Sequence, residues 1–119
     1  GFYFHREGQG LVFGGREPTI EGVASHGTRR LPVLAELPIQ SSWWGYYEMT
    51  PDHNPILGFV EEGLLVAAGF SGHGVQQAAM VGRLMAEEVA FGQAQSLDRT
   101  PFRLRRFWEG KPLRERGIV

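Results

Sequence analysis

The chain of 119 residues contains no cysteine. This absence excludes disulfides, thiolate nucleophiles, and zinc or iron–sulfur sites with sulfur ligands. The chain also lacks an excess of positive charge, since 12 lysines and arginines stand against 13 aspartates and glutamates. Without a basic field to attract phosphate backbones, nucleic acid is not an expected partner.

Long apolar runs are missing as well. Charged residues or glycine interrupt every apolar stretch well short of the roughly 20 residues that a membrane helix needs, and no basic-then-apolar leader opens the sequence. We therefore expect a cytoplasmic protein without a membrane segment. With 42% hydrophobic residues, residues 1–119 suit one compact unit better than two.

Glycine, by contrast, is abundant: 17 of 119 residues, about twice the roughly 7% of an average protein. Glycine allows tight turns and close approach of the backbone to another group. Two β-rich runs, Gly1–Glu7 and Leu11–Gly15, flank a glycine-bearing segment and predict a β-hairpin. Residues 16–30 show no helical or strand period and are expected to form a loop. The leucine-rich segment 29–39 predicts a short helix that Pro38 ends.

The middle of the chain predicts strands separated by tight turns. Residues Trp43–Met49 are interpreted as an aromatic strand. Residues Thr50–Pro55 are interpreted as a turn, because proline fixes φ and Asp or Asn side chains bind neighbouring backbone groups. A strand is expected at Ile56–Val60, and a further turn leads into Leu64–Ala68. This last run is apolar throughout, which is typical of a strand buried on both faces.

The clearest helix is expected at Val75–Phe91, with Gly92 in the position of a left-handed C-terminal cap. Small and apolar residues form its predicted inward stripe, while Glu87 and Glu88 are placed on the opposite side. The tail, residues 96–119, is expected to wrap the surface and to be anchored by aromatic side chains. The predicted stripe is Val75, Ala78, Ala79, Gly82, Met85, Ala86 and Val89, and the predicted anchors are Phe102, Phe107 and Trp108.

The strand Leu64–Ala68, the glycine-rich turn Gly69–Gly74 and the helix from Val75 form the most informative stretch. A helix N-terminus carries unpaired N–H groups and a positive partial charge, and Gly72 and Gly74 would let an electron-rich ligand atom reach them. The pattern favours an anionic or carbonyl oxygen as ligand, although a tight turn without a ligand explains three glycines equally well. The Gly-x-Gly-x-x-Gly order of a dinucleotide fingerprint is absent.

Two other chemistries are weaker interpretations. Ser71 lies in a setting similar to a nucleophile elbow, but His73 occupies the position of the second motif glycine and no histidine follows it. Asp52, His53 and His73 could form a metal or acid–base cluster, since imidazole and carboxylate both ligate metals and transfer protons. No short ligand spacing supports that cluster. Turn capping by Asp52 and partial burial of His73 are preferred, and no metal site is predicted.

Taken together, these segments resemble the C-terminal signature of the D-amino-acid-oxidase-like FAD-dependent oxidoreductases, which include sarcosine oxidase, glycine oxidase, dimethylglycine dehydrogenase and the β subunit of proline dehydrogenase. A Trp-x-Gly strand, a Thr-Pro-Asp turn, a Pro-x-x-Gly and a Gly-x-Ser-Gly-His-Gly turn occur in the family's order. Residues 2–15 resemble the hairpin of the substrate domain, and Phe102–Phe107 resembles the closing Arg-Phe segment. The matching stretches are Trp43-Trp44-Gly45-Tyr46-Tyr47-Glu48-Met49-Thr50-Pro51-Asp52-His53-Asn54-Pro55-Ile56-Leu57-Gly58 and Gly63-Leu64-Leu65-Val66-Ala67-Ala68-Gly69-Phe70-Ser71-Gly72-His73-Gly74-Val75.

The resemblance implies that the turn Gly69–Gly74 brings the helix N-terminus to the pyrimidine edge of the flavin, where amide N–H groups and the helix dipole stabilise negative charge. Sarcosine oxidases tether the flavin to a cysteine where this chain has Gly45, so FAD would bind non-covalently. They also place a lysine near the substrate carboxylate where this chain has Gln76. No catalytic residue is assigned. The implied FAD-contacting residues are Gly45, Gly69, Ser71, Gly72, His73, Gly74 and Val75, and the implied substrate-contacting residues are Tyr46, Tyr47 and Gln76.

The implied fold class is α+β. An antiparallel substrate-domain sheet lies within residues 1–60, and residues 61–119 supply a C-terminal strand, glycine turn and helix that complete a flavin-binding domain. The Rossmann βαβ half, which binds the ADP part of FAD in the family, is absent.

The implied function is oxidation of the C–N bond of an amino acid or secondary amine by hydride transfer to FAD. The expected partners are a small amine or amino-acid substrate and an N-terminal FAD-binding half, or a second copy of the chain. The alternative is a non-catalytic interaction module that keeps the fold without the cofactor.

Overall fold

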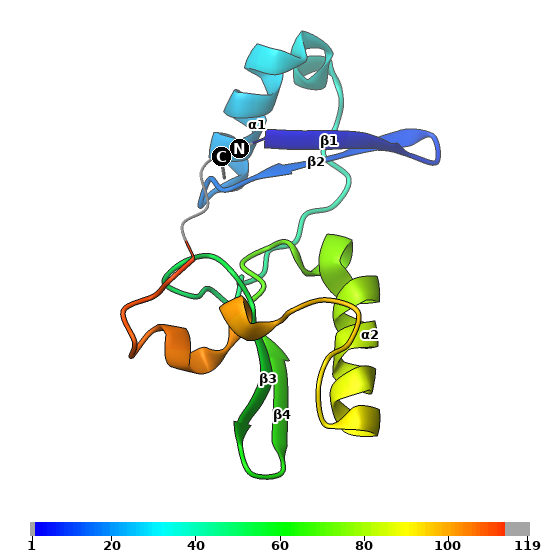
Figure 1. The fold of residues 1–119 in the computed structure, drawn as a ribbon. Coiled ribbons are helices and arrows are strands. Elements are labelled where there is room, and N and C mark those ends of the chain that lie inside the picture. The colour runs from blue at the N-terminus through cyan, green and yellow to red at the C-terminus, as the bar shows by residue number, and fades with distance from the viewer. Residues whose placement is uncertain (1, 114–119) are drawn as a thin grey trace. The chain divides into compact units, whose positions relative to one another are not determined.

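The computed structural model describes residues 2–113 and divides them into two compact units, residues 2–44 and residues 45–113. Figure 1 shows their helices and strands. The content is α+β, with two antiparallel sheets and two α-helices in the described residues. The single-unit organisation predicted from the length of the chain stays a prediction.

The first unit is built on the predicted hairpin. Strands β1 (Phe2–Glu7) and β2 (Gly10–Gly15) pair antiparallel along their whole length. Gly8 in the connecting turn has a φ of +56°, a left-handed conformation that a short hairpin turn favours and glycine adopts without strain. The rings of Phe2 and Phe13 lie 6.0 Å apart on the paired strands, within the range of favourable aromatic contact.

Residues 16–30 were expected to form a loop, and this prediction was wrong. They contain helix α1 (Ile20–Arg30), whose N-terminus is capped by the Thr19 hydroxyl accepting a backbone N–H at 3.1 Å. Gly27 argued against a helix in the sequence, yet it is the buried position of α1. A Cβ at this position would lie 3.0 Å from the Phe2 ring, so the glycine permits close packing of the helix on the hairpin.

The short helix expected within residues 29–39 is present as the 3-10 helix η1 (Pro32–Glu36), and it ends before Pro38. Its buried residue, Leu34, also contacts the position of Gly27. The first unit thus closes its small apolar centre with side chains from three of its elements.

The second unit contains the predicted strand–turn–helix. Strands β3 (Ile56–Glu61) and β4 (Leu64–Ala68) form an antiparallel hairpin with an irregularity in register between Phe59 and Glu61. Helix α2 (Gly74–Phe91) follows and runs beside this hairpin (Figure 1). These elements confirm the predicted hairpin and helix, and α2 begins one residue before the predicted Val75.

The C-terminal cap of α2 is also as predicted, because Gly92 adopts φ +75° and its N–H donates to Glu88 O at 2.9 Å. The tail then crosses the unit through two short 3-10 helices, η2 (Thr100–Phe102) and η3 (Leu104–Arg106). Both contact β3.

A small apolar core holds the second unit together. Leu57 of β3 is 3% exposed, and Leu84 of α2 is 1% exposed. Partly buried side chains from the glycine turn, the helix and the tail surround this core, which places the tail among the structural elements of the unit. The buried members are Leu57, Val81 and Leu84, and the surrounding members are Phe70, Met85, Ala94 and Phe102.

Helix α2 buries a different face from the one predicted. Val75 is 96% exposed and Val89 is 72% exposed. The other small residues of the predicted stripe, Ala78, Ala79, Gly82 and Ala86, are exposed as well. The buried positions are Val81, Leu84, Glu87 and Glu88. Burial of leucine and valine removes more apolar area from water than burial of alanine and glycine, and the two glutamates find hydrogen-bond donors in the tail.

Three further predictions need correction. Residues 43–49 form no strand, because no second strand pairs with them in the described part of the chain. Strand β4 is not buried on both faces: Leu64 is 46% exposed, since the described sheet has only two strands and one face stays open. Among the predicted tail anchors, Phe102 packs against the core, whereas Trp108 is exposed.

Candidate functional site

The turn between β4 and α2 adopts backbone conformations that depend on its glycines. Gly69 has φ +74° and Gly72 has φ +87°, both in the left-handed region that side chains disfavour. A Cβ at Gly69 would overlap the Thr50 Cγ2 atom. The turn therefore reverses the chain within a few residues and brings the first turn of α2 next to the end of the strand.

Ser71 lies in the same turn at φ +53° although it carries a side chain. Such a conformation is strained and persists where the surroundings fix it. Ser71 is 1% exposed, its N–H donates to Glu48 O at 3.0 Å, and its hydroxyl donates to Gly69 O at 3.2 Å. The same hydroxyl accepts from Thr50 N at 3.3 Å. Ser71 thus joins the turn to the segment before β3, and it is not exposed as a nucleophile would be.

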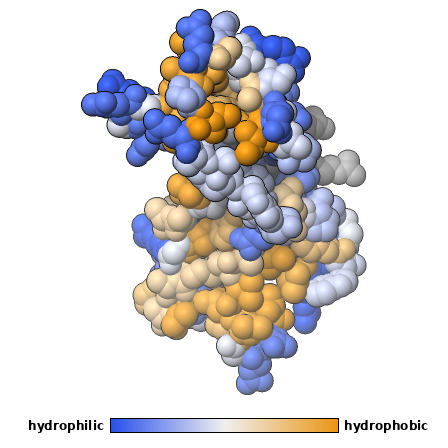
Figure 2. Space-filling view, turned by 180° about the vertical axis from the view of Figure 1, so that it is seen from behind, coloured by the Kyte–Doolittle hydropathy of each residue, from blue (hydrophilic) through white to orange (hydrophobic). Residues whose placement is uncertain are grey.

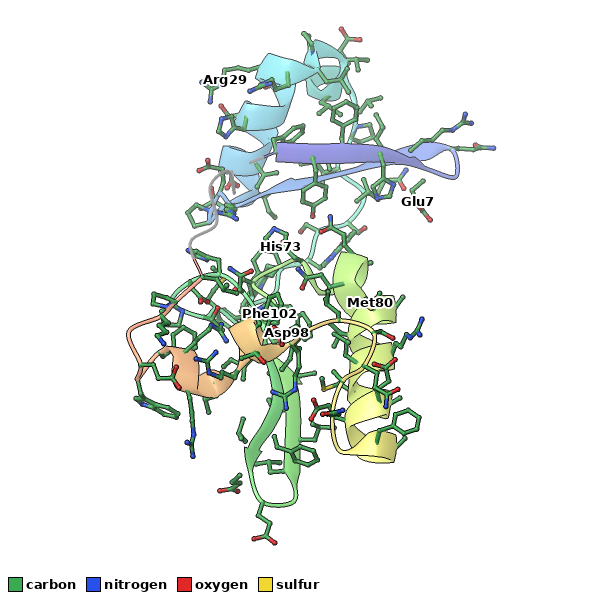
Figure 3. The ribbon with its side chains drawn as sticks, viewed as in Figure 1. Glu7, Arg29, His73, Met80, Asp98 and Phe102 are labelled. Atoms are coloured by element: carbon green, nitrogen blue, oxygen red, sulfur yellow. The ribbon has the colours of Figure 1, made fainter. Side chains whose placement is uncertain are left out.

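The N-terminus of α2 presents backbone donors. His73 is the N-cap residue, but its side chain makes no capping hydrogen bond, and the first turn holds no acidic residue. Within residues 2–113, the N–H groups of Gly72, Gly74 and Val75 donate to no acceptor. Together with the positive end of the helix dipole, these donors favour an oxygen that carries negative charge. Figure 3 shows His73 at this end of the helix.

Of the predicted substrate-contacting residues, Tyr47 lies at the glycine turn. Its ring packs against the backbone of Gly72, where an added Cβ would be 3.2 Å from the ring. Tyr46 is 91% exposed, and no atom lies within 4 Å of a Cβ placed at Gly45. Gln76 is exposed on the first turn of α2. The structure therefore places the Tyr47 ring at the turn, and it places Gln76 on the helical turn that follows.

The Thr50–Asn54 turn is held by an ion pair that the sequence did not predict. Arg106 is completely buried, and its Nε and Nη2 atoms donate to the two Asp52 carboxylate oxygens at 2.8 and 2.9 Å. Such a bidentate pair fixes both side chains in place. Asp52 also accepts from Asn54 N at 3.2 Å, which is the predicted turn capping, and from Leu113 N at 2.9 Å.

These contacts explain the ionisation of Asp52. Burial raises the pKa of the carboxyl, but hydrogen bonds from Arg106 and from two backbone N–H groups outweigh that effect and hold the pKa well below its usual range. His53 is exposed and adopts a left-handed conformation at φ +59°. Within residues 2–113 no three His, Asp or Glu side chains come together as metal ligands.

A second polar cluster lies at the other end of α2. Glu88 is 2% exposed and pairs with Arg99 through two hydrogen bonds, one of them from Nη2 at 2.9 Å. Glu87 accepts from the backbone N–H groups of Gln95 and Ser96, each at 2.8 Å, and from the Ser96 hydroxyl. Helix α2 is thereby joined to the first residues of the tail.

The pKa values of these two glutamates are lowered. The hydroxyl and the N–H of Ser96 are the main reasons why the pKa of Glu87 falls from 4.5 to about 2. The side chain of Arg99 is the main reason why the pKa of Glu88 lies below its ordinary value. A carboxyl whose pKa is lower in the folded chain stabilises the fold above its unfolded pKa, and this stabilisation is lost as the pH falls through the folded value.

We therefore predict that the unfolding free energy declines as the pH falls from about 4.5 towards 2. The Glu87→Gln variant should lose part of this pH dependence, because its amide does not titrate. Urea unfolding followed by circular dichroism at several pH values in this window measures both curves. The control is Glu62→Gln in the exposed β3–β4 turn. Equal slopes for the wild-type chain and Glu87→Gln would contradict the prediction.

Comparison with known proteins places these features in a family. Residues 1–88 match the DAO family model, described as FAD dependent oxidoreductase. Over 93 residues, 76% of this chain and 19% of the other protein, the sequence is 42% identical to FAD-dependent oxidoreductase domain-containing protein 1 of Xenopus laevis. Over 110 residues, 87% of this chain and 29% of the other, it is 36% identical to N-methyl-L-tryptophan oxidase of Salmonella dublin.

A solved structure is also similar. The crystal structure of L-proline dehydrogenase from P. horikoshii matches 94% of this chain with a TM-score of 0.82 and 34% sequence identity, and the match covers 34% of that protein chain. The chain thus spans about a fifth to a third of the length of these relatives. In the described residues no helix is both long and apolar enough to cross a bilayer. From its sequence matches and its fold, the chain belongs to the DAO family of FAD-dependent oxidoreductases, whose cofactor is FAD.

Proposed function

We propose that the chain is the C-terminal part of an FAD-dependent oxidoreductase that oxidises the C–N bond of an amino acid or secondary amine. The observation that carries this proposal is the β4–turn–α2 unit, with unbonded N–H groups at Gly72, Gly74 and Val75 and no acidic residue in the first helical turn. The names of two relatives, an N-methyl-L-tryptophan oxidase and an L-proline dehydrogenase, support a substrate of this class.

The residues at the turn fit one edge of a flavin. Glycines at positions 72 and 74 keep the backbone accessible, so that N–H groups can approach an oxygen or nitrogen of the ring closely. These donors and the helix dipole stabilise negative charge at the pyrimidine edge. When bound, FAD would supply the hydride acceptor for oxidation of the substrate C–N bond to an imine, which water would hydrolyse.

Tyr47, Gln76 and Gly45 have distinct proposed roles beside this edge. Tyr47 forms a wall of the substrate pocket, because its ring already lies on the Gly72 backbone. Gln76 donates a neutral hydrogen bond to the substrate carboxylate. Gly45 offers no thiol, so the flavin is held without a covalent bond. Ser71 contributes by fixing the conformation of the turn, since its hydroxyl is already bonded within the protein.

The outward face of α2 is the proposed contact for the FAD-binding half of the enzyme. Its exposed stripe of valine, alanine and glycine permits close approach of another backbone, and monomeric proteins rarely leave a long apolar helix face open. Figure 2 shows apolar side chains gathered over the second unit. The proposed occupant is the dinucleotide-binding part, because the relatives are three to five times longer than their matched portion.

The proposal predicts that FAD titrated into this chain alone gives no tight, saturable binding. One helix N-terminus contributes on the order of 0.3–2 kcal/mol, whereas micromolar affinity requires about 8 kcal/mol. Addition of a matching N-terminal FAD-binding half should restore flavin binding and bleaching of the flavin absorbance by an amine substrate. Fluorescence titration and absorbance at the flavin bands measure the two effects.

Two variants separate the proposed roles in the reassembled enzyme. Gly74→Val should weaken flavin binding by blocking approach to the backbone, while Gln76→Ala should raise KM for a carboxylate-bearing amine and leave flavin affinity unchanged. Sub-micromolar FAD binding by the 119 residues alone, or unchanged flavin affinity in Gly74→Val, would contradict this assignment of the site.

A further inference from the structure

We infer that Arg106, in the tail, is a positioning residue for the glycine turn Gly69–Gly74 and acts on it through Asp52 and Thr50. The coupling is a property of the chain itself. Its importance for cofactor binding rests on the proposed function, in which this turn meets the flavin.

The first step is the fixed position of Arg106. Besides its two bonds to Asp52, the guanidinium donates to Asn54 O at 2.8 Å and to Phe102 O at 2.9 Å. It also lies 4.1 Å from the centre of the Phe107 ring. A buried guanidinium with this set of acceptors has one geometry available, because any rotation leaves donors without partners and away from water.

The second step leads from the ion pair to Thr50. The Thr50 hydroxyl lies 2.7 Å from Asn54 O and 3.2 Å from Asp52 Oδ1. Arg106 donates to both of these oxygens, so either acceptor of the Thr50 proton is also bound by Arg106. Thr50 is 7% exposed, and water is therefore not available to replace these bonds. The side-chain orientation of Thr50 follows from the position of the Asp52–Arg106 pair.

The third step leads from Thr50 to the turn. Its N–H donates to the buried Ser71 hydroxyl, and its Cγ2 methyl occupies the space left by the missing side chain of Gly69. Ser71 and Gly69 are both left-handed, and Ser71 does not prefer that conformation. The contacts with Thr50 supply the fixed surroundings that such a residue needs. Displacement of Thr50 therefore alters the turn directly.

The inference is tested by backbone amide NMR of the 119-residue chain without cofactor. In Arg106→Met, the signals of Gly69, Ser71 and Gly72 are expected to shift. In Arg106→Lys, which keeps the charge and one donor nitrogen but not the bidentate geometry, they should shift less. The control is Arg103→Met, because Arg103 belongs to the same tail but pairs with the exposed Glu109. Turn signals that stay in place in Arg106→Met, while Asn54 and Leu113 shift, would overturn the inference.

Substitutions at Thr50 keep the test decisive where Arg106→Met prevents folding. Thr50→Ser retains the hydroxyl and removes the methyl that contacts Gly69, whereas Thr50→Val retains the methyl and removes the hydroxyl. Thr50→Ser breaks the methyl contact with Gly69, and Thr50→Val breaks the hydroxyl bonds to Asp52 and Asn54. Both variants should therefore shift the signals of Gly69 and Ser71. If neither variant moves the signals, the coupling is absent.

A second measurement separates this inference from the proposed function. In the chain reassembled with an FAD-binding half, Arg106→Lys should weaken FAD binding about tenfold, which corresponds to about 1.4 kcal/mol, with KM for the amine changed less than the flavin affinity. Turn signals that shift without any change in FAD affinity would support the coupling and contradict the assignment of the turn as the flavin edge. Unshifted turn signals would overturn the coupling and leave that assignment standing.

Discussion

Replacement of Asp52 by alanine is expected to lower the free energy of unfolding by about 3–5 kcal/mol, because it leaves a buried guanidinium without its carboxylate. Arg106 is fully buried and the Asp52 side chain is 3% exposed, so solvent cannot compensate for the loss. The Leu113 and Asn54 N–H groups lose an acceptor in the same variant. Urea unfolding followed by circular dichroism measures the change.

Asp98 provides the matched control. Its carboxylate also accepts a backbone N–H, from Thr100 at 2.9 Å, but the contact is exposed at the start of η2. Asp98→Ala should therefore lower the unfolding free energy far less than Asp52→Ala does, because water can replace the lost acceptor. A loss in Asp52→Ala no greater than that in Asp98→Ala would mean that the buried pair adds nothing to stability.

The Leu84→Ala variant should destabilise the second unit by about 2–5 kcal/mol, the range found when a large buried side chain is truncated and leaves a cavity. Leu84 is 1% exposed, and among the described residues the core cluster of the second unit has only three buried apolar members, so few neighbours are available to fill the space. Since small domains are stable by only about 5–15 kcal/mol, thermal unfolding should occur at a clearly lower temperature.

Met80→Ala on the same helix is the control for this effect. Met80 is 46% exposed and projects from α2 away from the core residues (Figure 3). Its truncation should change the unfolding free energy by no more than about 0.5 kcal/mol. Similar losses in the two variants would show that the helix does not bury the face that the structure assigns to it.

The elements that the sequence predicted well are those fixed by neighbouring residues. Both hairpins follow from β-rich runs around glycine turns, and α2 follows from its length and from Gly92 at its end. The positive φ angles at Gly69 and Gly72 could also be predicted from the residue type, because few residues other than glycine adopt them without strain. The glycine turn, at which the candidate site is proposed, could therefore be predicted from local patterns.

The features that sequence reasoning missed depend on distant residues. The burial of Glu87 and Glu88 depends on hydrogen-bond donors supplied by Ser96 and Arg99. The hydrophobic stripe predicted from the sequence placed both carboxylates on the solvent face of the helix instead. No periodicity distinguishes Arg106 from the other arginines of the tail.

Two further misses concern helix α1 and the conformation of Ser71. Gly27 counted against α1, since glycine lowers helix propensity, but the contact with Phe2 and the Thr19 cap decided the outcome. The positive φ of Ser71 is sustained by Thr50 and Glu48, which are far from it in the sequence.

The ion pair between Asp52 and Arg106 has a consequence for the order of folding, because it joins residues 54 positions apart. The β3–β4 hairpin and α2 require only local contacts and can form early, whereas closure of so long a loop is slow and comes late. During synthesis at about 5–20 residues per second, Arg106 emerges roughly 3–11 seconds after Asp52. Throughout that interval Asp52 lacks its Arg106 partner, so the buried ion pair does not yet hold the Thr50–Asn54 turn. We therefore expect the β3–β4 hairpin and α2 to form before the ion pair fixes the position of Thr50 beside the glycine turn.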